Sequence, residues 1–524
     1  MTEHVWKLGA RELASRIARG DLTSSEVVAA HIERIESVNP LLNAVVVKRY
    51  DEAREEAAEL DRKRAAGEAL GPLHGVPMTI KECLDFGGLP STYGVIAHRH
   101  DFPGKDDPYV ARFRKAGAVI LGKTNVAQLL MFVETDNPVY GRTQNPWALD
   151  RSPGGSSGGE GAIIAALGSP LGLGTDIGGS SRNPAAACGV VGFKATAGRL
   201  PDHGRGSMPI GQLAIQSQLG VLGRKVEDVV LATEIANGGR EPGDDGRPLG
   251  DPAAVDLSKL VVGYYTDDGV LPACGAAVRA VREAREALQS RGAMVVPFAP
   301  PHMMDSLALF HEILAGDGAR GMRQFLDGSP QDFRIKRLTT MAATPRPALG
   351  LVFKLMRLSK RRKLEALLRS AGRHDTSSHW HAVASLEDYR AKVLAALDRA
   401  APAPIDVLLS PAMALPALRH GATRELGVVG AYSAIYNVLG YPSGVVPFTR
   451  VFESEQTITS RSSDLMDRAA LETERDSAGL PIGVQVAARP FREHVVFAVM
   501  QALEQAALER ADRPSADALP ALFR

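Results

Sequence analysis

Two polar, glycine-rich loops separated by a short apolar segment place the strongest constraint on what this chain can fold into. The first loop, residues 154–159, reads Gly-Gly-Ser-Ser-Gly-Gly, and the second, residues 174–184, reads Gly-Thr-Asp-Ile-Gly-Gly-Ser-Ser-Arg-Asn-Pro. Between them, residues 161–167 are small and apolar, which predicts a closely packed buried helix. Glycines let the main chain adopt unusual φ and ψ angles and approach a ligand closely. We therefore expect the chemistry of this chain between residues 150 and 200.

Apolar segments on either side of these loops alternate between helical and strand patterns. Thr23 and Glu26 have the spacing of a capping box, and residues 8–66 are predicted to be helical. Repetition of helix and strand predicts a layered α/β body. Strands are predicted at 75–80, 117–121, 407–410, 444–447 and 482–486, helices at 109–116, 226–237, 276–291 and most of 302–400, and a loop at 239–256. Residues 453–478 are polar and charged, which indicates a surface insertion.

The composition argues against several classes of protein. The 524 residues carry 61 Lys and Arg against 60 Asp and Glu, and this near-neutral balance argues against a dedicated nucleic-acid binder. The three cysteines, Cys83, Cys188 and Cys274, are too scattered for a disulfide framework or a zinc cluster, which favours a reducing, cytoplasmic compartment. The first residues lack the pattern of a signal peptide, and no run of about 18 apolar residues occurs, so we expect no integral membrane association.

Two short motifs match known patterns, but their surroundings argue against both. Residues 117–124, Gly-Ala-Val-Ile-Leu-Gly-Lys-Thr, fit the phosphate-binding loop of ATPases letter for letter. Their four variable positions are hydrophobic, so a buried strand is the favoured interpretation. Residues 154–158 fit the Gly-x-Ser-x-Gly elbow of α/β-hydrolases, which must follow a strand, whereas residues 145–153 contain two prolines and no strand pattern.

A third pattern combines the two loops with a lysine. Lys81 ends the strand predicted at 75–80, and Ser156 and Ser180 lie 24 positions apart in the two glycine-rich loops. This arrangement resembles the amidase signature family, and further blocks that look like this family occur at 73–82, 117–125, 187–194 and 479–486. The resemblance implies an α/β fold with a large mixed β-sheet flanked by helices on both faces, and hydrolysis of amide bonds. It also implies one amidase domain over 1–524, with a signature catalytic core at 70–235 and a variable, mostly helical substrate-side region at 300–400.

A lysine can act as a base only when its amine is uncharged. A free lysine has a pKa of about 10.4. Burial of Lys81 beside Val76, Met78 and Ile80 would lower that pKa, because a low-dielectric environment disfavours the ammonium ion. A solvated surface charge is the alternative for a lone lysine at the end of a strand.

The resemblance assigns roles to the two serines. In the amidase signature family a second serine relays the proton between the nucleophile and the lysine. The resemblance therefore implies that Ser180 is the nucleophile and that its proton passes through Ser156 to Lys81. The same resemblance implies a cis peptide bond between Gly155 and Ser156. A cis bond that does not precede proline costs about 3 kcal/mol, so it persists only where its surroundings enforce it.

Backbone and side chains beside Ser180 complete the implied site. The family pattern implies that the N–H groups of Ile177, Gly178 and Gly179, with that of Ser180, bind the oxyanion. Four neighbours are expected to support the site: Gly155, Ser157, Asp176 and Arg182. By composition Ser157 and Ser181 could also be nucleophiles, and only the family spacing makes them supporting hydrogen-bonders. Asp176 and Arg182 could each bind substrate, but a structural salt bridge or a loop clamp is the favoured role. Cys188 is expected to be a buried packing thiol rather than a nucleophile.

The sequence leaves the substrate open. Residues 128–133 and 137–147 look similar to the fatty-acid and aryl amide branches of the family, which implies that Met131 and Phe132 contact an apolar acyl group; helix packing is the alternative. Residues 349–363 form a basic amphipathic segment, for which a membrane-surface helix, a lid and a solvated helix are alternatives.

Partners follow from the same arguments. We expect no metal and no cofactor, a small-molecule amide as substrate, and no nucleic acid; a homodimer stays open. The alternative function within the same fold is the glutaminase subunit of a tRNA-dependent amidotransferase, although residues 300–400 show no feature typical of it.

Overall fold

A mixed sheet of 11 strands forms the centre of the computed structural model, which describes residues 4–202, 211–238, 247–344, 346–369, 373–456 and 463–523. Antiparallel and parallel pairs both occur: β2 runs parallel to β3 and β6, whereas β6 runs antiparallel to β8. In sheet order the strands are β1 (Val45–Lys48), β3 (Val119–Thr124), β2 (Pro77–Lys81), β6 (Leu171–Asp176), β8 (Gln218–Gly223), β7 (Val191–Lys194), β12 (Ser443–Arg450), β13 (Pro481–Ala488), β11 (Val407–Pro411), β9 (Val261–Tyr264) and β10 (Met294–Pro297). Strands β4 (Asp136–Asn137) and β5 (Gly141–Arg142) form a separate ribbon.

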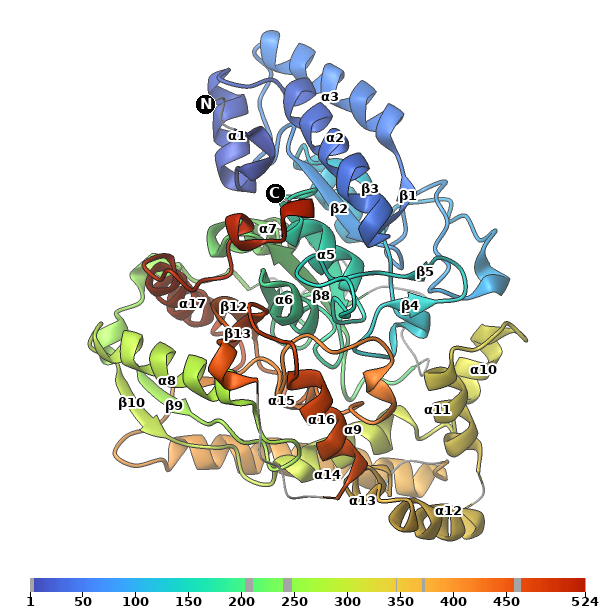
Figure 1. Ribbon diagram of the computed structural model, residues 1–524. Coiled ribbons are helices and arrows are strands. Elements are labelled where there is room, and N and C mark those ends of the chain that lie inside the picture. Colours follow the sequence, from blue (N-terminus) through green and yellow to red (C-terminus); the bar gives the residue numbers. More distant parts are fainter. Residues whose placement is uncertain are drawn as a thin grey trace.

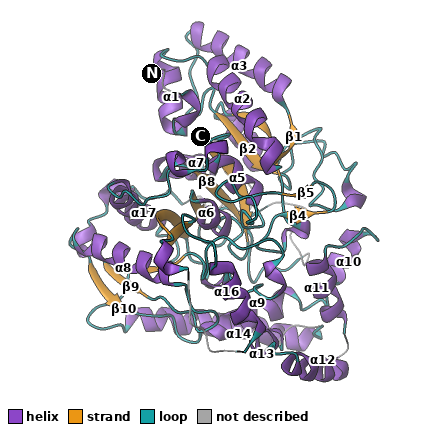
Figure 2. Ribbon diagram, viewed as in Figure 1, coloured by secondary structure: helices purple, strands orange, loops and turns teal. Residues whose placement is uncertain are grey.

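Helices cover both faces of this sheet. Every residue of β2, β3, β6, β8 and β13 is buried, and a strand whose alternating side chains are all buried has packing partners on both faces. The packed helices are α1 (Ala10–Arg19), α2 (Ser24–Leu42), α3 (Tyr50–Ala65), α4 (Pro108–Lys115), α5 (Gly158–Ala165), α6 (Arg182–Cys188), α7 (Val226–Asn237), α8 (Gly275–Gln289), α15 (Ala431–Val438), α16 (Leu465–Glu474) and α17 (Glu493–Leu508). Figure 2 shows the orange strands enclosed by purple helices, which confirms the predicted α/β fold.

A second group of helices lies at the lower side of the view in Figure 1 and belongs to residues 300–400. They are α9 (Met303–Leu314), α10 (Arg320–Leu326), α11 (Phe333–Ala343), α12 (Arg346–Leu358), α13 (Arg362–Leu368) and α14 (Thr376–Asp398). The helical pattern predicted there is confirmed for the described residues. No described helix is both long and apolar enough to cross a membrane.

Two predicted elements need correction. Residues 45–48 are strand β1 rather than helix: Asn43 takes a left-handed conformation that ends α2, and three successive valines then favour an extended chain at the sheet edge. The strand predicted at 117–121 begins at Val119 and continues through Lys123 and Thr124. Since all of β3 is buried, the phosphate-loop interpretation is wrong and the strand interpretation is confirmed.

The segment predicted as a surface insertion contains a helix in its described part, α16. Residues 457–462 lie outside the described residues, as do 239–246 of the predicted loop. Helix α16 follows, and it buries Met466, Ala470 and Glu474 against the rest of the chain. The buried positions of α16 include the carboxylates of Asp467 and Glu474, and the surface insertion over 453–478 stays a prediction.

Candidate active site

Lys81 occupies the last position of the buried strand β2, with its side chain 0% exposed. Its Nζ donates to Ser156 Oγ at 2.9 Å and to Thr175 Oγ1 at 2.8 Å. Burial lowers the pKa of Lys81, even though the nearby carboxylates of Asp176 and Glu160 act to raise it. The surface-charge alternative is therefore wrong, and the amine is poised to lose its charge.

The two glycine-rich loops meet at the ends of α5 and β6. The peptide bond between Gly155 and Ser156 is cis, as the family resemblance implied. The N–H of Ser157 donates to the carbonyl oxygen of Ser180 at 3.1 Å, which ties one loop to the other. A Cβ at Gly155 would lie 2.4 Å from the carbonyl oxygen of Phe132, so only glycine fits against this backbone. Ser156 is fully buried, whereas Ser180 is partly exposed towards a cavity.

The structure shows one step of the implied relay directly and places the backbone of Ser180 against Ser157, the residue after Ser156. Lys81 and Ser156 are hydrogen-bonded, and within the described chain the hydroxyls of Ser156 and Ser180 form no hydrogen bond. Catalytic hydrogen bonds are often long in the absence of substrate and tighten in the complex. The second step of the relay therefore stays a prediction.

Asp176 and Arg182 form the salt bridge that the sequence analysis favoured. Arg182 Nη2 lies 2.9 Å from Asp176 Oδ1, and both side chains are fully buried. The Arg182 guanidinium holds the pKa of Asp176 well below its usual range. Arg182 Nη1 also donates to Gln485 Oε1 on β13, and Asn437 Nδ2 on α15 donates to Asp176 Oδ1. The pair therefore anchors the Ser180 loop to the C-terminal half of the chain.

One of the four predicted oxyanion donors is already engaged. The N–H of Gly179 donates to Asp176 Oδ1 at 2.8 Å, so Gly179 belongs to the clamp and its assignment as a free donor is wrong. The backbone of Ile177 and Gly178 lines the cavity beside Ser180, and among the described residues their N–H groups have no hydrogen-bond acceptor. A Cβ at Gly178 would lie 2.9 Å from the ring of Phe310, which keeps this loop closely packed against α9.

An apolar cavity of about 160 Å³ opens at Ser180. Met131 and Phe132 line it on the side of the first loop, and their predicted contact with an acyl group stays a prediction. Further apolar walls come from residues 300–400, the predicted substrate-side region, and from residues 427–434; they include Leu307, Phe310, Leu314, Met322, Leu338, Val428 and Ala434. No charged side chain lines this cavity in the described part of the chain. Transfer of an apolar group into it is favourable because apolar surface leaves water.

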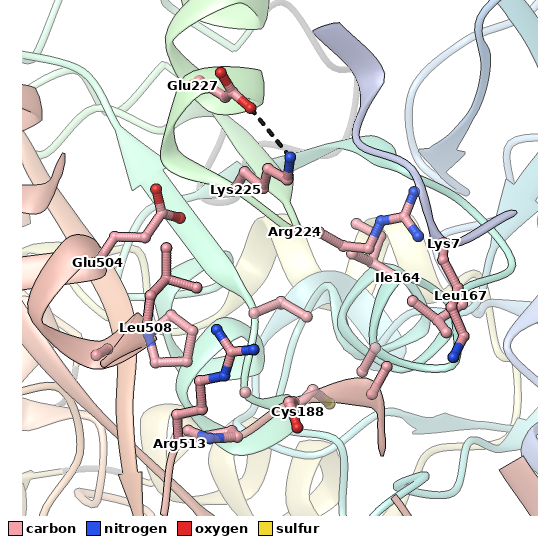
Figure 3. A pocket seen from close by; sticks show the side chains of 18 of the residues that line it. Lys7, Ile164, Leu167, Cys188, Arg224, Lys225, Glu227, Glu504, Leu508 and Arg513 are labelled. Carbon is pink, nitrogen blue, oxygen red and sulfur yellow. Dashed lines mark hydrogen bonds and ion pairs between the residues drawn. The ribbon is translucent and has the colours of Figure 1, made fainter. Parts of the chain in front are cut away.

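A different cavity, of about 580 Å³, lies at the far end of α5 and α6 (Figure 3). Arg224, Lys225 and Arg513 border it, and Lys225 is paired with Glu227 at 3.3 Å. Cys188 also lines it, with its Sγ donating to the carbonyl oxygen of Pro153 at 3.3 Å, and all three cysteines are buried. Lys81, Ser156 and Ser180 do not line this cavity, whereas Ser180 lines the apolar one.

Two residues near Lys81, Thr175 and Glu160, could not be found from the sequence motifs. Thr175 directly precedes Asp176 in the second loop and supplies the second partner of the amine. Glu160, at the start of α5, is buried and accepts hydrogen bonds from Thr79 and Thr124. Burial raises the pKa of Glu160 to about 8. A buried carboxyl beneath the lysine left no signal in the sequence, because Gly-rich surroundings suggest a solvated loop.

Replacement of Arg182 is expected to cost much of the protein's stability. Arg182→Met leaves the carboxylate of Asp176 buried without its counter-ion, and breaking a buried pair in this way typically costs about 3–5 kcal/mol. The free energy of unfolding from urea titrations measures this loss. The double variant Asp176→Asn with Arg182→Met removes both charges and should recover part of it; equal instability of the two variants would contradict the ion-pair argument.

The fold and the site define a hydrolase of the α/β class, with hydroxyl groups and a buried amine beside an apolar cavity. The Amidase family model matches residues 26–497. Fatty-acid amide hydrolase 1 of Sus scrofa is 32% identical over 509 residues, covering 94% of this chain and 85% of that protein. A glutamyl-tRNA(Gln) amidotransferase subunit of Synechococcus sp. (strain CC9605) is 30% identical over 534 residues, covering 99% of both chains. The solved structure of a fatty acid amide hydrolase superposes with a TM-score of 0.82 at 26% identity, covering 96% of this chain and 86% of that one.

The chain belongs to the amidase family, of the amidase signature type. It is accordingly an amidase, a hydrolase that cleaves amide bonds.

Proposed function

We propose that this amidase hydrolyses amides of apolar acyl or aryl groups through an acyl-enzyme formed on Ser180. The observation that carries the proposal is the buried amine of Lys81, 2.9 Å from Ser156 Oγ, beside the apolar cavity that Ser180 lines. Esters, anilides and carbamates are further substrates of such an acylating centre.

The proposed reaction uses the chain's own groups. Ser180 Oγ attacks the carbonyl carbon of the amide while its proton passes to Ser156, and Ser156 passes its own proton to the neutral amine of Lys81. The N–H groups of Ile177 and Gly178 stabilise the oxyanion, a contribution of about 2.7–4 kcal/mol per donor in comparable sites. The C–N bond then breaks as Lys81 returns the proton through Ser156 to the leaving amine. Water hydrolyses the acyl-enzyme by the same relay.

The division of the chain fits this proposal. Residues 70–235 supply all three signature residues and serve as the catalytic core. Residues 300–400 contribute Leu307, Phe310 and Leu338 to the cavity and serve as the substrate side. Residues 453–478, which contain α16, contribute no side chain to this cavity among the described residues.

The alternative is the glutaminase function that the name of the Synechococcus relative suggests. Glutamine has a polar side chain, which would need hydrogen-bonding partners where it is buried. The acyl side of the cavity instead presents methyl and phenyl groups from Phe132, Leu314 and Met322. This lining favours an apolar acyl group over glutamine.

A panel of amides tests the proposal. We expect kcat/KM for alkanamides to rise about fourfold for each added methylene until the cavity is filled, because each buried CH₂ contributes about 0.8 kcal/mol. The panel crosses acyl chain lengths with ammonia, aniline and carbamate leaving groups, and includes glutamine. A flat dependence on chain length, with glutamine as the best substrate, would support the glutaminase function instead.

A further inference from the structure

The cavity at Ser180 continues into a second cavity of about 110 Å³. The two share lining residues from several elements, which are Phe132, His311, Leu338, Gly427 and Val428. Cavities that share this many walls adjoin each other. The two cavities therefore meet at His311 of α9 and Leu338 of α11, and an acyl chain on Ser180 that is longer than the first cavity would extend past His311 towards the outer cavity beside α13.

The middle of this path is uncharged. His311 Nδ1 lies 2.8 Å from the carbonyl oxygen of Leu307, which can only accept, so Nδ1 carries the proton. Burial lowers the pKa of His311, which keeps the imidazole neutral. A methylene chain passing this point meets apolar walls and one neutral ring.

The outer cavity, in contrast, has a cationic end. Arg334, Arg337 and Arg424 line it, and no carboxylate does so among the described residues. Arg334 is neutralised by Glu134, with Nη1 and Oε2 3.1 Å apart, and by Asp332. The positive charge of the outer cavity therefore comes from Arg337 and Arg424.

Arg337 and Arg424 have no ion-pair partner in the described chain. Arg337 Nη1 donates to the carbonyl oxygen of Arg424 at 2.6 Å, and the Arg424 guanidinium lies over the ring of Phe333 at 4.9 Å. The neighbouring Glu425 is held by Arg361, with Oε1 2.8 Å from Nη2. Burial lowers the pKa of Arg337, because its guanidinium lies partly out of water; the carboxylate of Glu425 acts against this shift, whereas the guanidinium groups of Arg361 and Arg424 add to it. An anionic group bound there would relieve this cost.

We infer that the outer cavity is an anion subsite, and that preferred substrates are amides whose acyl chain ends in a carboxylate. This inference rests on the proposed function, since Ser180 must hold the other end of the same chain. A guanidinium presents paired N–H donors that match the two oxygens of a carboxylate. Hydrolysis of such an amide consumes one water and releases a dicarboxylate and an amine.

Matched substrates test the inference directly. The probes are the monoamides of adipic, suberic and sebacic acid, each compared with the neutral alkanamide of equal chain length. For the monoamide whose chain spans both cavities we expect kcat/KM at least tenfold above that of its neutral counterpart. Arg337→Gln should abolish most of this preference, and Arg337→Lys should retain part of it because the charge remains.

Lys336→Gln is the matched control. Lys336 is the exposed neighbour of Arg337 on α11, and its side chain does not line the outer cavity. The same loss of charge there should leave the preference for the monoamide unchanged. If Arg337→Gln fails to fold, Arg424→Gln tests the same subsite from an exposed position.

The outcomes separate this inference from the proposed function. Hydrolysis of the neutral alkanamides without any preference for a monoamide overturns the anion subsite and leaves the amidase proposal intact. A preference that Arg337→Gln and Lys336→Gln reduce equally also overturns it, because general electrostatics would then suffice. Failure to cleave any of these amides overturns both.

Discussion

Replacement of Ser180 by alanine is expected to reduce kcat/KM by at least about 10⁴-fold. Ser180 is the proposed nucleophile, and loss of a nucleophile in an acyl-transfer site leaves only the binding and oxyanion contributions. The substitution removes one hydroxyl that is partly exposed to the cavity, so the fold should persist. Steady-state hydrolysis of a preferred alkanamide measures the loss, and circular dichroism checks the fold.

Ser181→Ala is the matched control for this prediction. Ser181 is the adjacent serine, is fully buried, and donates through Oγ to the carbonyl oxygen of Thr175 at 3.2 Å. Its replacement should keep kcat/KM within about tenfold of the parent, since it removes one hydrogen bond of about 1 kcal/mol. A serine-directed fluorophosphonate should label Ser180 in the parent and in Ser181→Ala but not in Ser180→Ala. Retained turnover in Ser180→Ala would refute the assignment.

Lys81 and the two glycine-rich loops could be identified from the sequence because each of them is a local feature of the chain. Strand β2 ends at Lys81, and the apolar residues before it make burial of the amine a direct consequence of the fold. Each glycine-rich loop is one continuous segment. Chain connectivity therefore keeps each serine close to the residues that hold its loop, Ser156 to Ser157 and Ser180 to Asp176. The phosphate-loop match failed for the same local reason, because an apolar run prefers the strand β3.

The rest of the site depends on contacts between residues far apart in the chain. Gln485 and Asn437, which hold Arg182 and Asp176, follow the second loop by more than 250 positions. Asn437 lies in none of the motifs, and the block at 479–486 contains Gln485 without indicating this contact. Gly179 illustrates the same limit: the family pattern made it an oxyanion donor, whereas the clamp at Asp176 takes its N–H. The spacing of motifs identifies the candidate reacting groups, but it does not show which other side chains, such as Asp176, accept the same N–H groups.

The cavity walls were the least predictable part. Helical periodicity indicates which face of α9 or α11 is apolar, but both core packing and a substrate channel produce that pattern. Only the fold shows that Phe310 and Leu338 converge on Ser180 from segments that share no motif. Strand β1 was missed for a related reason: its stability comes from pairing with β3 at the sheet edge rather than from its own length.

Replacement of Lys81 by methionine is expected to have the second large effect, and it tests the amine separately from the packing of the side chain. Lys81→Met keeps most of the side chain's volume but removes the amine that Ser156 and Thr175 contact, so we expect a loss of about 10⁴-fold in kcat/KM. Lys123→Met is the matched control. Lys123 is equally buried on the adjacent strand β3, and its Nζ donates to Ser91 Oγ at 2.8 Å, away from the two serines. Both variants should lose stability, but only Lys81→Met should lose the reaction.

The pH profile distinguishes a base from a merely structural lysine. An ammonium ion cannot accept a proton, so kcat/KM of the parent should rise with pH through the pKa of Lys81 and then level off. Because burial lowers that pKa, the rise should occur below the value of about 10.4 that an exposed lysine has. Lys81→Met should lose this rise, leaving its residual activity flat over the same pH range, whereas Lys123→Met should keep the profile of the parent. A parent profile that rises only near pH 10.4, or a residual Lys81→Met activity that rises with pH as the parent's does, would show that Lys81 is not the base.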